Sequence, residues 1–277
     1  MPVIQHVIQK APFRAPFVFL PFLLFILFTA GLCAATQSSQ CKPATYDERA
    51  KVAHVYDGDT IELTDGRKIR LIGVNTPERG HDGDKDEPFY LEAKKHLQQL
   101  LKQSQGQIYL TLGQEQRDHY KRTLAHIFTL SGENISATLI QRGLGFSITV
   151  PPNLRFLNCY QDAEQSAQKS KRGIWQSPHH RIINAVSLTT SSSGFHRING
   201  KIKRIGESKS FYWLNLETSS NINFALRIPK KDMIYFVQYH PKNLLHQYVT
   251  ARGWVSLKNG ELRMTIHHPA SLQRQKI

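Results

Sequence analysis

Residues 57–78 read DGDTIELTDGRKIRLIGVNTPE, and this stretch decides the fold that we expect. Asp57-Gly58-Asp59 has the composition of a tight turn, and Thr60 to Leu63 follows it as a strand. Asp65-Gly66 is a hairpin signal, after which Lys68 to Val74 forms the next strand. The stretch therefore predicts part of a β-meander, with an acidic turn at one end and an arginine inside the last strand.

The flanking residues extend this meander into a small barrel. Arg49 to Tyr56 alternates loosely and supplies a strand before the turn, while Pro88 opens a helix whose apolar residues recur at helical spacing. Two further strands and two further helices are expected, at Gln107–Leu112, Thr123–Leu130, Ile135–Arg142 and Leu154–Lys171. Five strands with an intervening helix fit a closed barrel of the oligonucleotide/oligosaccharide-binding (OB) type.

The C-terminal part of the chain is again rich in strands. Residues 36–178 make the first domain, and residues 179–196, with their run of Ser and Thr, are expected to form a linker. Residues 197–277 contain several short strands separated by turns and predict a second, smaller OB-like barrel. The expected fold class is mainly β with helices (α+β), built from two small barrels.

Aromatic and basic residues are interleaved in this second segment. Phe211-Tyr212-Trp213 lies among Lys201, Lys203, Arg204, Lys209, Arg227, Lys230 and Lys231. Aromatic platforms with basic neighbours bind single-stranded nucleic acid, which would give this barrel a substrate-holding role. The other interpretation places the rings in the barrel core, because alternate strand residues must fill the interior. The sequence leaves both interpretations open.

The residues around the acidic turn suit one kind of chemistry. Asp59 and Asn75 stand at the ends of adjacent strands and, with the Thr76 carbonyl, offer the oxygen ligands that hard cations prefer. Glu78 lies just beyond them and suits the activation of a water. Arg70 and Arg122 each offer a planar guanidinium that can donate several hydrogen bonds to phosphate oxygens. Together these groups predict metal-assisted hydrolysis of a phosphodiester.

With these residues in view, residues 49–176 resemble the staphylococcal nuclease (thermonuclease) family. The resemblance is carried by Asp57-Gly58-Asp59-Thr60, Arg70 to Glu78, Glu87-Pro88-Phe89, Asp118 to Arg122, Leu124-Ala125-His126, Gln141-Arg142-Gly143-Leu144 and Gly173-Ile174-Trp175. Their order and spacing make the match specific over nearly half the chain. It implies a five-stranded barrel with three helices. It also implies Ca²⁺-dependent endonuclease cleavage of DNA and RNA that leaves 3′-phosphate ends, with Mg²⁺ or Mn²⁺ as alternative cations.

The resemblance implies a metal site with one departure from the family pattern. Asp59, Asn75 and the Thr76 carbonyl would be the ligands, and Asp57 would support the turn and the outer shell of the metal. Asn75 stands where the best-known member of the family has an aspartate. An amide oxygen still coordinates a hard cation but brings no negative charge, so a lower metal affinity or a shifted metal preference is expected.

The resemblance also implies how the phosphate is handled. Glu78 would activate or orient the water, Arg70 and Arg122 would bind the phosphate and stabilise the pentacoordinate transition state, and Tyr120 would flank the phosphate. Lys121 stands where a glycine usually precedes the second arginine. If that turn needs a positive φ, lysine is disfavoured there and Arg122 is expected to sit slightly differently.

The bulk composition agrees with a polyanionic partner. The 277 residues suggest two domains, and 36 Lys+Arg against 21 Asp+Glu give a net charge of +15. Such an excess favours a polyanionic partner, either nucleic acid or an anionic membrane surface. A basic protein with no such partner is the other interpretation of the charge.

The N-terminus predicts export. Lys10 and Arg14 precede an apolar run over residues 17–35 that ends in Cys33-Ala34-Ala35, which is typical of a signal peptide cleaved after Ala35. The expected location is therefore secreted or periplasmic. The alternatives are an uncleaved membrane anchor at 17–35 that leaves the protein facing outward, and a lipoprotein through Cys33, against which the bulky Leu32 argues.

Export leaves Cys41 and Cys159 as an even pair in an oxidising compartment. A disulfide between them and two separate thiols are both compatible with the sequence. We expect the protein to act as a monomer. Two other functions are compatible with the sequence. One is a non-catalytic nucleic-acid-binding protein of the cell envelope, and the other is an envelope interaction protein.

Overall fold

The computed structural model describes residue 3 and residues 41–80, 83–219 and 222–275. The chain divides into two units, Met1–Thr36 and Gln37–Ile277, and every described helix and strand belongs to the second unit. The predicted signal or anchor segment, residues 1–35, lies outside the described residues except for Val3. Within the described ranges, no helix is both long enough and apolar enough to cross a membrane.

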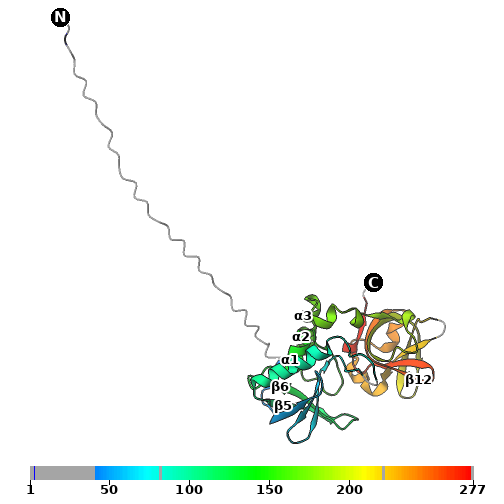
Figure 1. Cartoon of the computed structure of the whole chain (residues 1–277). Coiled ribbons are helices and arrows are strands. Elements are labelled where there is room, and N and C mark those ends of the chain that lie inside the picture. The colour runs from blue at the N-terminus through cyan, green and yellow to red at the C-terminus, as the bar shows by residue number, and fades with distance from the viewer. Residues whose placement is uncertain (1–2, 4–40, 81–82, 220–221, 276–277) are drawn as a thin grey trace. The chain divides into compact units, whose positions relative to one another are not determined.

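The first barrel is closed by five strands, as predicted (Figure 1). They are β1 (Glu48–Val55), β2 (Thr60–Leu63), β3 (Lys68–Leu71), β5 (Gln107–Arg117) and β6 (Thr123–Phe128). Their order is β1-β2-β3-β6-β5, the β5–β1 pairing closes the barrel, and only the β3–β6 pair is parallel. The inward side chains Ile61, Ile69, Leu110 and Ile127 are fully buried and make the core.

The predicted strand over residues 68–74 is wrong in its second half. It ends at Leu71, and Val74–Asn75 forms a separate strand, β4, which pairs with β7 (Phe146–Ser147). Gly73 has φ +86°, and a Cβ at this position would lie 2.0 Å from the Tyr160 ring. Only glycine fits this close approach with a left-handed backbone. The break at Gly73 thus gives Asn75 a partner strand outside the barrel.

Three helices accompany the first barrel, namely α1 (Tyr90–Gln103), α2 (Ile135–Gln141) and α3 (Leu157–Lys169). Helix α1 begins after Pro88 because Phe89 has φ 74°, and it buries Ala93, Leu97 and Leu101. The side chain of Asn134 caps α2 by accepting from the Ala137 amide at 3.1 Å. A disulfide joins Cys41 to Cys159 on α3, which decides between the two alternatives left open for these cysteines.

The buried His126 on β6 makes the fold sensitive to acid. Its Nδ1 lies 2.7 Å from the Tyr160 hydroxyl. Burial, with a smaller contribution from the charge of Arg155, lowers the pKa of His126 to about 3. The unfolded chain protonates this imidazole near pH 6.5, about its ordinary pKa. Between these two values the unfolded state binds more protons, so stability is lost as the pH falls through that window.

We expect His126→Gln to weaken this pH dependence. When the pH is lowered from roughly 7.5 to roughly 4.5, the variant should lose about 2–3 kcal/mol less unfolding free energy than the wild type. The reason is that the lower pH lies about two units below the pKa of histidine in the unfolded chain. Urea denaturation at each pH measures the difference. His54→Gln, at an exposed position of β1, is the matched control and should behave as the wild type does. An unchanged pH dependence in the His126 variant would contradict the argument.

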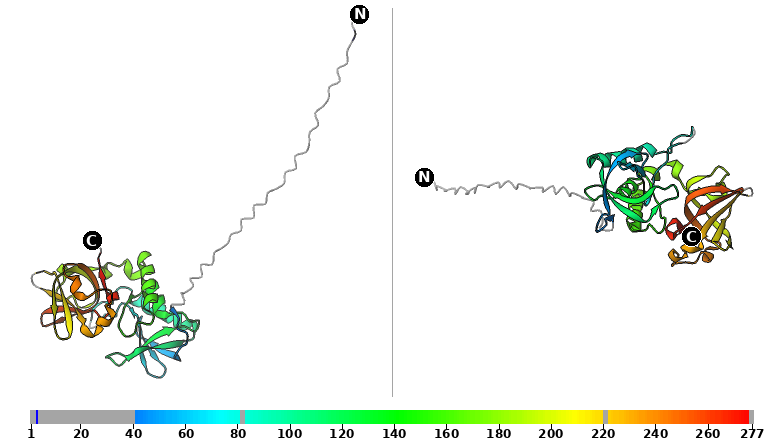
Figure 2. Two further views of the ribbon diagram at one scale, coloured as in Figure 1. Left: turned by 180° about the vertical axis from the view of Figure 1, so that it is seen from behind. Right: turned by 90° about the horizontal axis from the view of Figure 1, so that it is seen from below.

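The second barrel repeats the topology of the first. Its strands are β9 (Gly194–Glu207), β10 (Phe211–Leu216), β11 (Asn223–Pro229), β12 (Tyr248–Lys258) and β13 (Glu261–Thr265). β12 pairs with both β13 and β9, which closes the order β9-β10-β11-β13-β12, and only β11–β13 is parallel among these five. Figure 2 shows these strands, coloured from yellow-green to orange-red, from two further sides. The predicted fold class, with two small barrels, is confirmed.

The segment predicted as a linker, residues 179–196, contributes to this second barrel. Within it, β8 (Ile183–Asn184) pairs with β9, and Ala185 and Leu188 are buried in the second core. The chain therefore joins the second core before the expected boundary at residue 197. At the other edge of the sheet, β14 (Leu272–Arg274) pairs with β12. Short 3-10 helices complete the fold at Gly173–Trp175, Pro178–His180, Ala185–Ser187, Lys230–Tyr235, Pro241–Leu244 and Pro269–Ser271.

A buried ion pair links α3 to the second barrel. Arg252 on β12 donates through Nη1 to both carboxylate oxygens of Glu164, at 2.7 and 2.6 Å, and to the Ser147 carbonyl at 3.1 Å. The Glu164 carboxylate also accepts from the Ser147 amide at 2.9 Å. Aromatic packing adds to this contact, since the rings of Phe146 and Phe195 lie 5.2 Å apart. The two barrels thus share one set of buried contacts.

Candidate active site

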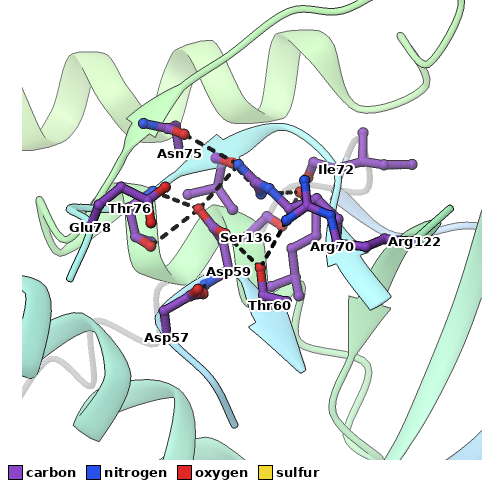
Figure 3. A network of polar contacts seen from close by, with 12 residues as sticks. Asp57, Asp59, Thr60, Arg70, Ile72, Asn75, Thr76, Glu78, Arg122 and Ser136 are labelled. Carbon is purple, nitrogen blue, oxygen red and sulfur yellow. Dashed lines mark hydrogen bonds and ion pairs between the residues drawn. The ribbon is translucent and has the colours of Figure 1, made fainter. Parts of the chain in front are cut away.

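Asp59 lies at the centre of the site, in the turn between β1 and β2 (Figure 3). It is 2% exposed. Its Oδ2 accepts from the backbone amide of Thr76 at 2.8 Å and from the Thr76 hydroxyl at 3.1 Å, while its Oδ1 accepts from the Thr60 hydroxyl at 3.2 Å. From the sequence we considered only the Thr76 carbonyl; the structure shows that the amide and hydroxyl of Thr76 hold the carboxylate in place.

Arg70 joins Asp59 to Asn75. Its Nη2 lies 3.1 Å from Asp59 Oδ2 and donates to Asn75 Oδ1 at 3.2 Å. Its Nη1 donates to the carbonyls of Leu71 and Val74 at 2.8 and 2.9 Å. The guanidinium therefore bridges the break between β3 and β4 and has little freedom to move. The residues that the sequence placed at the ends of adjacent strands do come together, and Arg70 is the group that connects them.

Two further carboxyls lie in the electrostatic field of Asp59. The Asp57 carboxylate accepts from the Asp59 amide at 2.8 Å and closes the turn. Burial, followed by the charge of Asp59, raises the pKa of Asp57 to about 6. Glu78 is exposed, yet the surrounding protein partly desolvates its carboxyl. This desolvation, followed by the charges of Asp59 and Asp57, raises the pKa of Glu78 to about 7. Negative charge is therefore concentrated here beyond what Arg70 offsets.

This donor set fits a hard divalent cation. The atoms near Asp59 that could coordinate a cation are oxygens, which are the ligands that Ca²⁺, Mg²⁺ and Mn²⁺ prefer. In the described part of the chain, no three His, Cys, Asp or Glu side chains are grouped so that they could hold a metal by themselves. A cation beside Asp59 would therefore draw on neutral oxygens, such as the Asn75 amide and the Thr76 carbonyl, and on water.

The loop from Asp118 to Arg122 brings the second arginine to the same site. Asp118 Oδ2 accepts from Arg122 Nε at 2.7 Å, and its Oδ1 accepts from the Tyr120 and Arg122 amides at 3.0 and 2.9 Å. Arg122 Nη1 reaches the Thr60 hydroxyl at 3.5 Å, next to Asp59. Sequence reasoning missed that Asp118 and Thr60 position Arg122, although the Asp118 motif was the available signal.

Glu87 positions the loop that carries Glu78. The Glu78 amide donates to the Glu87 carboxylate at 3.0 Å, and the Glu87 amide donates back to the Glu78 carbonyl at 3.0 Å. Tyr120 is 69% exposed at the outer edge of the site, where its ring lies 5.3 Å from the Arg122 guanidinium carbon. The arrangement therefore places two guanidiniums, each held by its own partners, beside a cluster of carboxyls that is able to hold a cation.

Lys121 has φ 65°, which is the left-handed conformation considered from the sequence. A side chain with a Cβ is strained there, whereas glycine is not. We expect Lys121→Gly to raise the unfolding free energy by about 1 kcal/mol without displacing Arg122, because Asp118 still holds that side chain. Urea denaturation measures the gain. Lys258→Gly, in strand β12 and outside the left-handed positions, is the control and should lower stability instead.

Comparisons with known proteins agree with this geometry. The family model for staphylococcal nuclease homologues matches residues 68–177, a range that contains Arg70, Asn75, Glu78 and Arg122. The thermonuclease of Staphylococcus hyicus is 32% identical over 132 residues, which cover 47% of this chain and 76% of that protein. The thermonuclease of Staphylococcus intermedius is 34% identical, covering 45% and 74%. Endonuclease YncB of Bacillus subtilis is 30% identical, covering 43% and 57%.

Proposed function

Because the chain belongs to the staphylococcal nuclease family and is a nuclease, we propose that it is an exported, Ca²⁺-dependent endonuclease of DNA and/or RNA that leaves 3′-phosphate ends. The observation that carries this proposal is the convergence of Asp59, Arg70 and Arg122. The buried Asp59 carboxylate pairs with Arg70 and accepts from Thr60 and Thr76, and Arg122 reaches the same Thr60 hydroxyl. An anionic diester needs such charges of both signs in one place.

In this proposal Asp59, the Asn75 amide oxygen and the Thr76 carbonyl would hold the cation, and Asp57 would support the turn. When bound, the cation supplies charge neutralisation at the phosphate and polarises a phosphoryl oxygen. Asp59 would be the one charged ligand among these three, since position 75 is an amide. The amide at position 75 is expected to change the metal preference, so Mg²⁺ and Mn²⁺ are tested beside Ca²⁺.

The other residues act on water and phosphate. Glu78 takes or orients the proton of the attacking water, from a loop that Glu87 holds. Arg70 and Arg122 offer fixed donors to the charge that develops on the phosphate oxygens in the transition state. Tyr120 flanks the phosphate at the exposed edge of the site. Water then attacks phosphorus in line with the departing oxygen.

The deciding experiment is a digestion of supercoiled plasmid and of labelled single- and double-stranded oligonucleotides with Ca²⁺, Mg²⁺, Mn²⁺ or a chelator, followed by end-group analysis. We expect nicked and linear products, 3′-phosphate ends and complete inhibition by the chelator. Cleavage that persists in the chelator would contradict the metal dependence. DNA that is retarded on a gel but stays intact with every cation would support the non-catalytic binding protein instead.

Export, secreted or periplasmic location and a monomeric state complete the proposal. The sequence of residues 1–35 supports export, and the Cys41–Cys159 disulfide suits an oxidising compartment. N-terminal sequencing of the protein recovered from its producing cells tests the first point, with a start at Thr36 as the expected result. An intact N-terminus in the membrane fraction would support the anchor at 17–35, and sedimentation measures the oligomeric state.

A further inference from the structure

The rings of Phe211 and Trp213 lie outside the second core. Along β10, Leu214 and Leu216 are buried in that core, so the alternate residues Phe211 and Trp213 point to the outer face. Tyr212 lies on the inner face of β10, with Leu214 and Leu216, and packs against the core. Of the two interpretations that the sequence left open, the core placement therefore fails for two of the three rings.

Arginines stack on both outer rings. Arg227 on β11 pairs with Trp213 in register, and its guanidinium carbon lies 5.3 Å from the centre of the Phe211 ring. The guanidinium carbon of Arg263 lies 5.3 Å from the Trp213 ring, and the two rings are 5.7 Å apart. The outer face of β10, β11 and β13 thus presents alternating flat aromatic and cationic groups. Both kinds of plane can stack on an unpaired base.

A cleft of about 580 Å³ connects this face to the active-site loop. Arg227, Trp254 and Thr265 line it from the second barrel, and His119 and Val150 line it from the first. Trp254 is 48% exposed and offers a further ring. The flat groups therefore continue across the cleft toward the nuclease barrel.

On the nuclease side of the cleft, the series of planes ends at the catalytic arginine. The His119 and Tyr120 rings lie 3.8 Å apart, and the Tyr120 ring lies 5.3 Å from the Arg122 guanidinium carbon. Arg122 is the group that we place on the phosphate. The outer face shares Arg227 with the cleft, and the cleft shares His119 with the loop that carries Arg122.

The charge of this region suits a polyanion. Residues 194–275 carry 13 lysines and arginines against four aspartates and glutamates. Arg227 donates through Nε to the Thr265 hydroxyl at 2.6 Å, and no carboxylate of the described residues forms an ion pair with it. Its charge is consequently available to a phosphate. Arg263, in contrast, pairs with Glu261 at 2.8 Å and serves mainly as a plane.

We propose that Phe211, Trp213, Arg227, Trp254, His119 and Tyr120 form a stacking track that binds a single-stranded nucleic acid and leads it into the active site. Unpaired bases stack on the rings while the arginines contact the backbone. A duplex keeps its bases stacked on one another and cannot use these planes. The track rests on the proposed function and deepens it, since it assigns the outer face of the second barrel as the surface that holds a single-stranded segment of the substrate.

The test measures binding without catalysis. A fluorescent oligothymidylate of about 20 nucleotides is titrated with the full-length protein in a chelator, and fluorescence anisotropy gives the dissociation constant. Trp213→Ala and Phe211→Ala should each weaken binding roughly 5- to 100-fold, the effect of one lost base–aromatic stack. Tyr248→Ala, an exposed ring on β12 outside the track, is the matched control and should bind as the wild type does.

Two further measurements separate the track from a general loss of folding or charge. A duplex of the same length should bind the wild type and both ring variants equally. A substrate of about four nucleotides, too short to leave the active site, should be cleaved at the wild-type rate by both variants. Loss of duplex binding together with oligothymidylate binding would overturn the stacking role, as would ring variants that bind oligothymidylate as the wild type does.

The outcomes also distinguish this inference from the nuclease proposal. If the wild type binds oligothymidylate through Trp213 but cleaves nothing with any cation, the nuclease proposal fails and the track stands. If the wild type cleaves nucleic acid but the ring variants bind and cleave as it does, the track fails and the nuclease proposal stands. Repeating the titration with oligouridylate shows whether DNA and RNA share the track.

Discussion

Glu78→Gln should lower the cleavage rate by about 10²- to 10⁴-fold, the usual contribution of a positioned general base. Glutamine keeps the size of the side chain and one of its acceptor oxygens but cannot take a proton from water. The backbone of residue 78 should stay in place, because the Glu87 carboxylate binds its amide rather than its side chain. Single-turnover cleavage of a labelled oligonucleotide measures the rate.

Binding provides the complementary measurement for this variant. The affinity for oligothymidylate in a chelator should remain at the wild-type value, because the charges on the phosphate come from Arg70 and Arg122. Glu92→Gln, at an exposed position in the first turn of α1, is the control and should cleave normally. A wild-type rate for Glu78→Gln would refute its assignment, and a joint loss of binding and cleavage would indicate a structural role instead.

Arg70→Ala should lower the unfolding free energy by about 3–5 kcal/mol, because it leaves one partner of a buried ion pair uncompensated. The Asp59 carboxylate has 3% of its side chain exposed and would lose its cationic neighbour. The carbonyls of Leu71 and Val74 and the amide oxygen of Asn75 would lose a donor as well. Urea denaturation in a chelator measures the effect.

The chain offers a control of the same residue type three positions earlier. Arg67 pairs with Glu48 and Asp65, but all three side chains are about one-third to one-half exposed. Surface pairs of this kind contribute about 0–1 kcal/mol, so Arg67→Ala should be nearly neutral. Equal losses in the two variants would contradict the buried pair. Repeating the measurement with Ca²⁺ tests the cation site, since a ligand that binds only the folded state raises its stability.

Local patterns predicted the strands and helices of both barrels because turns and periodicity act over few residues. Asp57-Gly58-Asp59 and Asp65-Gly66 mark their turns by composition alone, and the helices show their apolar spacing directly. The failures have a physical cause in longer contacts. The strand predicted to reach Val74 breaks at Gly73 because the ring of Tyr160 lies against it. Residues 183–188, rich in neither strand nor helix signals, join the second core through pairing with β9.

For the site, the sequence by itself determined the chemical groups, since Asp59, Arg70, Glu78 and Arg122 carry the carboxylates and guanidiniums that the proposed reaction needs. Only the tertiary structure decided how they are held. Asp118 and Thr60 position Arg122, and Arg70 connects Asp59 to Asn75. The outward direction of Phe211 and Trp213 likewise depends on which side of β10 meets the second core. Such pairings depend on register and burial between distant segments, and no local pattern of residues encodes them.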